Sequence, residues 1–165
     1  MRTSLTLRIL VISFACLFGA SLATAGSGGP EDTVKAFSAG FGAKDKDAVI
    51  TTLAEGGAQF TLRAQHESTP PESIQTEITA YWTVVAPVLI TSTSSYVRTL
   101  DILDVRVDGD IATVWTQTHT ASTPLNSTEA DRNSFTEVYL VVKRADGWKI
   151  AGMADNRQTT KIQGN

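Results

Sequence analysis

The chain has 165 residues, of which 42% are hydrophobic, and a formal net charge of −3. This length is sufficient for one domain with a substantial core. The sequence contains one cysteine and no run of basic residues, which excludes a disulfide framework and argues against nucleic acids and anionic membrane surfaces as partners.

Residues 1–25 have the three parts of a secretory signal peptide. A basic start carries Arg2 and Arg8, and residues 9–20 are almost all apolar. The small residues of Ala23-Thr24-Ala25 then occupy the two positions that a signal peptidase reads. The apolar stretch is shorter than the roughly 20 residues that span a membrane. We therefore expect cleavage after Ala25 and a secreted or periplasmic protein with no membrane attachment. Cleavage removes 2 of the 14 basic residues and none of the 17 acidic ones, so the net charge falls from −3 to −5.

Two helices are predicted after a flexible leader over residues 26–30. Pro30 opens the first helix, with acidic residues in its first turn and Phe37 on its buried face. Asp45 caps a second, short helix whose apolar side extends to Leu53, and the glycines at 56–57 end it. A short strand over 58–62 follows.

A third, longer helix is predicted from a capping box formed by Thr69 and Glu72, with prolines at the first helical positions. Pro87 is expected to kink or end this helix near its C-terminus. The apolar residues on one face of the helix are Ile74, Ile78, Tyr81, Trp82, Val85 and Leu89.

From Ser95 the apolar period changes to two, which predicts four strands ending near residue 157. Asp-Gly pairs at 108–109 and 146–147 make tight turns, and a polar loop over 122–133 contains a glycosylation sequon at Asn126. Residues 158–165 form a polar tail. Strict alternation along the first of these strands places Val97, Thr99, Asp101, Leu103, Val105 and Val107 on one face.

The segments Val-Arg-Val-Asp-Gly-Asp-Ile-Ala at 105–112 and Asp-Gly-Trp-Lys-Ile at 146–150 resemble recurring turns of SnoaL-like and ketosteroid-isomerase-like proteins. These proteins belong to the nuclear transport factor 2-like superfamily, whose order of elements agrees with residues 31–157. The resemblance implies an α+β, cone-shaped roll, in which N-terminal helices pack on a curved, mostly antiparallel sheet and leave a conical pocket, often in a homodimer. The superfamily includes isomerases, dehydratases, cyclases and proteins without known activity, so the fold does not select a function.

Asp101 is the candidate catalytic residue, because alternation points it into the cone, where an apolar environment raises a carboxyl pKa. The alternative is that Asp101 is solvated or pairs with a nearby arginine. His66, in a polar loop, and His119, on the face opposite Val114, are weaker candidates. The histidines have no metal-ligand spacing, so we expect neither a metal nor a cofactor.

The expected pocket is lined by small hydroxyls and an amide, which orient ligands well but transfer protons poorly at neutral pH. On the last strand, Gly152, Ala154 and Asn156 are expected to point inward, so a strong acid or base is missing there. The predicted ligand-binding residues are Phe37, Phe60, Tyr81, Trp82, Thr99, Thr116, Thr118 and Asn156.

Three functions remain open. The first is binding of a small apolar or amphipathic molecule without catalysis. The second is a cofactor-independent isomerase, dehydratase or cyclase, with Asp101 as acid or base and Tyr81 or Asn156 as oxyanion donor. The third is an interaction module that uses no pocket. Alternation places Trp115, Phe135 and Tyr139 on one sheet face, which we expect to form a homodimer interface.

Overall fold

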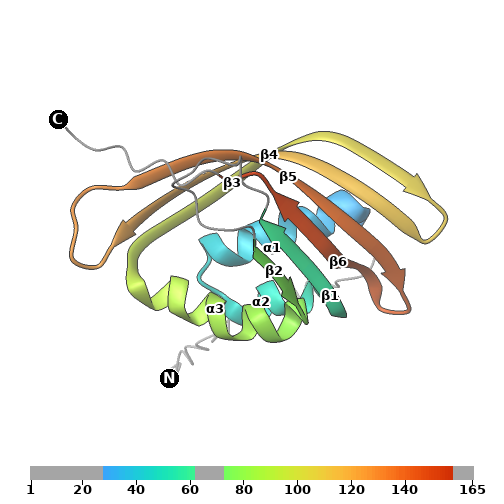
Figure 1. The fold of residues 1–165 in the computed structure, drawn as a ribbon, viewed down its shortest axis with the longest axis horizontal. Helices are drawn as coiled ribbons and strands as arrows, with labels where there is room; N and C mark the ends of the chain where they lie inside the picture. The colour runs from blue at the N-terminus through green and yellow to red at the C-terminus, as the bar shows by residue number, and fades with distance from the viewer. Residues whose placement is uncertain (1–27, 62–72, 158–165) are drawn as a thin grey trace, which may run out of the picture.

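The computed structural model describes residues 28–61 and 73–157, which form three helices and one curved, six-stranded sheet (Figure 1). This confirms the predicted α+β class. The signal peptide, His66, the capping box at 69–72 and the polar tail lie outside the described residues. The elements are α1 (Pro30–Gly42), α2 (Lys46–Thr51), β1 (Leu53–Thr61), β2 (Ser73–Thr76), α3 (Ile78–Ser92), β3 (Thr93–Asp108), β4 (Ile111–Pro124), β5 (Asp131–Arg144) and β6 (Gly147–Asp155).

The strands are arranged in the order β2-β1-β6-β5-β4-β3. Neighbouring strands are antiparallel except for β1 and β6, which run parallel. Figure 1 shows the long strands arching over the helices, so that one sheet face meets the helices. We call this the inner face and the opposite one the outer face. No helix within residues 28–61 and 73–157 has the length and hydropathy needed to cross a membrane.

Local signals that were visible in the sequence begin and end several elements. Asp32 accepts a hydrogen bond from the backbone N–H of Gly29 at 3.0 Å at the start of α1, and Asp45 accepts one from Ala48 at 3.0 Å at the start of α2. The turn glycines Gly109 and Gly147 have positive φ angles of 57° and 114°. The predicted starts of α1 and α2 and the two Asp-Gly turns are therefore confirmed.

An aromatic cluster forms the core between α1, α3 and the inner face. The Phe37 ring lies 5.3 Å from Phe41, 5.7 Å from Trp82 and 6.2 Å from Tyr139, centroid to centroid, and all three contacts are edge-to-face. Val114 on β4 and Ile150 on β6 are fully buried in the same core. This core thus holds the helices against the inner face of the sheet.

Some predicted boundaries were wrong. Residues 73–76 form β2 rather than the first turn of a helix, and Ile74 is 64% exposed because it lies on this short strand. The glycines at 56–57 lie within β1, which begins at Leu53, and do not end α2. A Cβ at Gly57 would lie 2.6 Å from the carbonyl oxygen of Ala151, so close strand packing explains this glycine. α3 continues through Pro87 to Ser92, and the predicted loop over 122–133 is shortened because β4 and β5 extend into it.

Candidate functional site

The orientation of β3 is set by a shift in its register with β4 between Ile102 and Asp104, as at a β-bulge. Before the shift, Arg98 points to the inner face and is buried, while Thr99 and Asp101 point outward. The predicted inward orientation of Asp101 is therefore wrong. Its side chain is 78% exposed, and its Oδ2 lies 3.8 Å from Nε2 of His119, as in the solvated alternative.

A second register shift, between β5 and β6, changes the inward positions of the last strand. Leu140 pairs with Gly152 but Val141 pairs with Ile150, so Ala151 is the extra residue. As a result, Met153 and Asp155 share the inner face with Ile150, and the predicted inward positions Gly152 and Ala154 are wrong. Asn156 is exposed, and its Oδ1 accepts a hydrogen bond from the backbone N–H of Thr136 at 2.8 Å.

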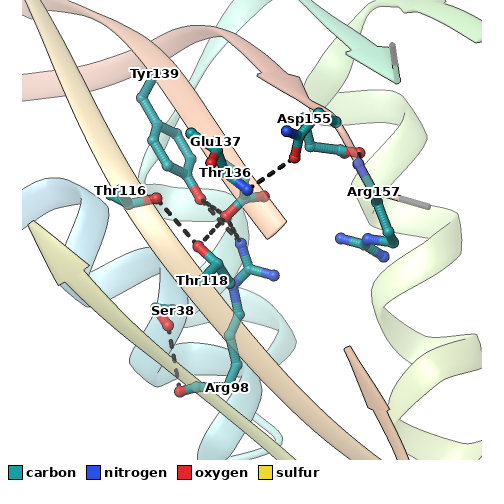
Figure 2. A network of polar contacts seen from close by, with 10 residues as sticks. Ser38, Arg98, Thr116, Thr118, Thr136, Glu137, Tyr139, Asp155 and Arg157 are labelled. Carbon is teal, nitrogen blue, oxygen red and sulfur yellow. Dashed lines mark hydrogen bonds and ion pairs between the residues drawn. The ribbon is translucent and has the colours of Figure 1, made fainter. Parts of the chain in front are cut away.

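Three donors converge on one carboxylate oxygen of Glu137 at the inner face (Figure 2). Arg98 Nη2 forms an ion pair with Glu137 Oε2 and also donates to the Tyr139 hydroxyl at 2.9 Å. The hydroxyls of Thr118 and Tyr139 donate to the same Oε2 at 2.5 Å and 2.8 Å. Thr116 lies 3.1 Å from the Thr118 hydroxyl. We call Arg98, Thr116, Thr118, Glu137 and Tyr139 the buried network.

The buried network holds a fixed pair of charges. Burial would raise the pKa of Glu137, but the Arg98 guanidinium and the three hydrogen bonds outweigh burial and lower it. Burial raises the pKa of Tyr139 far above its ordinary value, so its hydroxyl stays neutral. Burial would lower the pKa of Arg98, yet Tyr139 and Glu137 more than offset it and raise that pKa. At neutral pH the network is therefore an ion pair with a neutral phenol, which is poorly suited to exchanging protons.

Asp155 is a second carboxyl on the inner face, and its pKa is raised where that of Glu137 is lowered. Its Cα is the cross-strand partner of Glu137, and the residue is 5% exposed. Burial raises its pKa, although the Arg157 guanidinium and a hydrogen bond from the Arg157 backbone N–H at 3.1 Å oppose this. The Arg157 guanidinium stacks on Phe135, 4.1 Å from the ring centroid. Because its pKa is raised while that of Glu137 is lowered, Asp155 is the better placed of these two inner-face acids to give or take a proton.

Four buried polar atoms on the inner side have no hydrogen-bond partner within residues 28–61 and 73–157. They are Gln59 Oε1, Trp82 Nε1, Arg98 Nε and Arg157 Nε. Gln59 sits beside Met153 across the β1–β6 pair, and both guanidinium groups lie near the Phe135 ring. An unsatisfied buried donor or acceptor costs about 1–3 kcal/mol, so each atom marks a place where a further polar group would be stabilised.

Comparison with known proteins identifies the fold. No protein-family model and no curated protein matches the sequence. A ketosteroid isomerase-like protein from Erwinia carotovora atroseptica superposes with a TM-score of 0.59 at 19% identity, covering 86% of this chain and 99% of that one. A candidate scytalone dehydratase from Novosphingobium aromaticivorans gives 0.65 at 12% identity, over 78% and 81%. A candidate dehydratase of the NTF2-like family from Streptomyces avermitilis gives 0.57 at 16% identity, over 78% and 92%.

This chain has the NTF2-like fold. The resemblance that the turn sequences indicated is confirmed at that level. Identities below one fifth show the shared architecture alone, so the neighbours' activities do not transfer with it.

The NTF2-like fold brings some of the predicted site residues together and separates others. Phe37, Trp82, Thr116 and Thr118 are buried on the inner side, and Tyr81 packs its ring 5.3 Å from Trp82. Thr99 lies on the outer face, and so does Phe60, which pairs with Ala154.

The predicted dimer face was wrong in two of its three members. Trp115 is on the outer face and 44% exposed, but Phe135 and Tyr139 are buried on the inner face. The register explains this, because Phe135 pairs with Thr118 and Tyr139 with Val114, whereas Trp115 pairs with Val138.

The charged residues of the inner face were not among the site candidates predicted from the sequence. The signal for Glu137 was present, since it alternates with Phe135, Tyr139 and Val141, all apolar or aromatic and all buried. Arg98 and Asp155 were assigned to the wrong face because each lies on a strand whose register shifts, which exchanges the faces that strict alternation assigns. No group of three or more His, Cys, Asp or Glu side chains in the described part of the chain is arranged to hold a metal ion.

Proposed function

We propose that this chain is an exported protein that binds a small amphipathic molecule on the inner side of its sheet. The observation that carries the proposal is the set of four buried polar atoms without partners beside an aromatic core. Three of them are donors, on Trp82, Arg98 and Arg157, and one is an acceptor, on Gln59. A ligand with carbonyl or carboxylate oxygens and one hydroxyl or amide donor would satisfy this set, whereas a purely apolar ligand would not.

The aromatic rings that lie near Trp82, Arg98 and Arg157 favour a flat or aromatic ligand body. Phe37 and Trp82 present ring edges to one another, and Phe135 already stacks against a guanidinium group. Small-molecule sites commonly combine such apolar walls with a few polar groups that fix orientation. The charges of the buried network are internally paired, so they would position the ligand without being altered by it.

A cofactor-independent isomerase, dehydratase or cyclase is the second candidate, and Asp155 is the observation that favours it. The sequence-based argument against catalysis was that no acid or base lined the last strand, and the inward position of Asp155 removes that argument. Asp155 would serve as acid or base in place of Asp101, which faces solvent. The ketosteroid isomerase-like and dehydratase-candidate neighbours support this candidate only as analogies of fold.

Binding can be tested by thermal denaturation of the purified protein with a panel of aromatic acids, ketones and phenols. We expect at least one compound to raise the melting temperature, because a ligand that binds only the folded state stabilises it. Arg157→Lys keeps the charge but removes Nε, and should weaken that compound by about tenfold, the cost of one hydrogen bond to a charged group. Arg144→Lys, at the exposed end of β5, is the matched control. Equal affinities in the two variants would contradict the proposed site.

The two candidates are separated by the fate of the bound compound and by Asp155→Asn. If the protein only binds, the compound is recovered unchanged and the substitution alters affinity alone. If it catalyses, turnover is observed with the wild type and is lost in Asp155→Asn while binding persists.

A homodimer through the outer face is a further proposal, supported by the apolar side chains exposed there. They include Ile111, Trp115 and Leu140, each between 42% and 54% exposed. Sedimentation velocity should show a dimer that Trp115→Lys dissociates. A wild-type monomer at micromolar concentration would refute this interface. Export is tested separately, by the mass of the N-terminal peptide of protein recovered outside the cytoplasm, which should begin at Gly26.

A further inference from the structure

The outer face carries a cleft that is separate from the inner site. It has a volume of about 340 Å³ and lies over β3, β4 and β5 near the end where β4 and β5 join. This volume is at the lower end of the range for small-molecule sites. Its lining residues are Val97, Thr99, His119, Thr120, Ala121, Arg132, Asn133 and Ser134.

The strand register explains why these side chains meet. Thr99, His119 and Ser134 are direct partners across three strands and form one polar row. Val97, Ala121 and Arg132 are partners in the adjacent row, two residues along. Because residues two apart share a sheet face, both rows open onto the same side. The cleft therefore joins an apolar floor to a guanidinium group and to a line of hydroxyl and imidazole groups.

The charges at the cleft are unevenly placed. No carboxylate in residues 28–61 and 73–157 lies within ion-pair range of Arg132, so its guanidinium is open to an anion. Asp101 lies in the next row along the strands, on the side of the polar row away from Arg132, and its Oδ2 is 3.8 Å from His119 Nε2. The cationic group, Arg132, and the acidic group, Asp101, thus lie on different sides of the polar row. This separation of charge would orient a ligand that has one charged head.

We propose that this cleft binds a small organic carboxylate with an apolar body. The Arg132 guanidinium pairs with the carboxylate, for which its planar fork of donors is suited. The Ser134 hydroxyl lies on the same face as Arg132 and can add a hydrogen bond to the same head. Val97 and Ala121 contact the apolar body. This pairing does not depend on the inner site, whose guanidinium groups lie on the other side of the sheet.

The test is a titration of the isotope-labelled protein with sodium benzoate, followed by amide chemical shifts. Benzamide is the uncharged probe of the same shape. We expect benzoate to shift the amides of Thr99, Ala121 and Ser134 saturably below about 10 mM, and benzamide to bind at least about tenfold more weakly. Arg132→Gln should weaken benzoate by about tenfold. Arg106→Gln, which changes an 81%-exposed arginine elsewhere on β3, should leave it unchanged.

Three results would overturn the proposal: no saturable shift, equal binding of benzoate and benzamide, or equal benzoate affinity in the two arginine variants. Shifts confined to inner-face amides such as those of Tyr139 and Met153 would also refute this cleft, and they would support the inner site instead. Arg157→Lys serves as the reciprocal control, because it should leave binding at the outer cleft intact.

Discussion

Removing one partner of the Arg98–Glu137 pair should cost far more stability than removing both. Each side chain is 4% exposed, so Glu137→Gln leaves a guanidinium group buried without its counter-charge. Breaking a buried pair in this way costs about 3–5 kcal/mol. Arg98→Met leaves the carboxylate with two hydroxyl donors and should cost a similar amount. The double variant, Arg98→Met with Glu137→Leu, removes both charges and should recover most of the loss.

Urea unfolding followed by tryptophan fluorescence measures these differences. The free energy of unfolding of a small protein falls by about 1–3 kcal/mol per molar urea, so each single variant should lower the midpoint by about 2 M. Thr118→Val removes one of the three donors to Glu137 but no charge, and is expected to cost about 1–2 kcal/mol. Single variants that each cost less than about 1 kcal/mol, with additive effects in the double variant, would refute the reasoning, because contacting charges must couple.

Three further predictions follow from the inner face and the glycines. The pKa of Glu137 is lowered, so the stability that this carboxylate contributes is present above pH about 4.5 and is lost as pH falls through the folded-state pKa. In urea unfolding at a series of acidic pH values, Glu137→Gln should therefore reduce the dependence of the free energy of unfolding on pH. The pKa of Asp155 is raised, so wild-type stability is lost as pH rises from the ordinary carboxyl pKa through the folded-state value. The stability of Asp155→Asn relative to wild type, measured by calorimetry, should therefore increase as pH rises above about 4, whereas a constant difference would be inconsistent with the shift. Gly57→Ala should lower the melting temperature, because its Cβ would meet the Ala151 carbonyl oxygen at 2.6 Å. Gly42→Ala is the control, because a Cβ there would have no atom within 4 Å, and it should be neutral or stabilising by up to about 1 kcal/mol. The opposite order of the two stabilities would refute the packing argument.

Features encoded by a few adjacent residues could be predicted from the sequence. Pro30 and the acidic residues after it define the start of α1, Asp45 caps α2, and the two Asp-Gly turns delimit the long strands. Each depends on local backbone geometry or local hydrogen bonds, which the residue types reveal. Ser73–Thr76 was misassigned because a four-residue strand exists only through its pairing with β1, which no local pattern records.

The candidate site was harder to predict because two register shifts determine which side chains enter the interior. Alternation fixes the faces of a strand only relative to one another, and one extra residue exchanges them from that point onward. On β3 this placed Asp101 outside and Arg98 inside, and on β6 it placed Asp155 inside in place of Ala154. The position of an extra residue depends on the partner strand. The pattern of residues within a single strand therefore does not reveal where the extra residue lies.

The most direct test of the proposed inner site is native mass spectrometry of the protein purified from the compartment in which it accumulates, without denaturation. The account predicts one small molecule bound per chain in the wild type, retained in Arg144→Lys and lost or strongly reduced in Arg157→Lys. A wild-type protein with the mass of the polypeptide alone, or a bound molecule that both variants retain equally, would contradict the claim that the unpaired groups of Trp82, Arg98 and Arg157 form a ligand site.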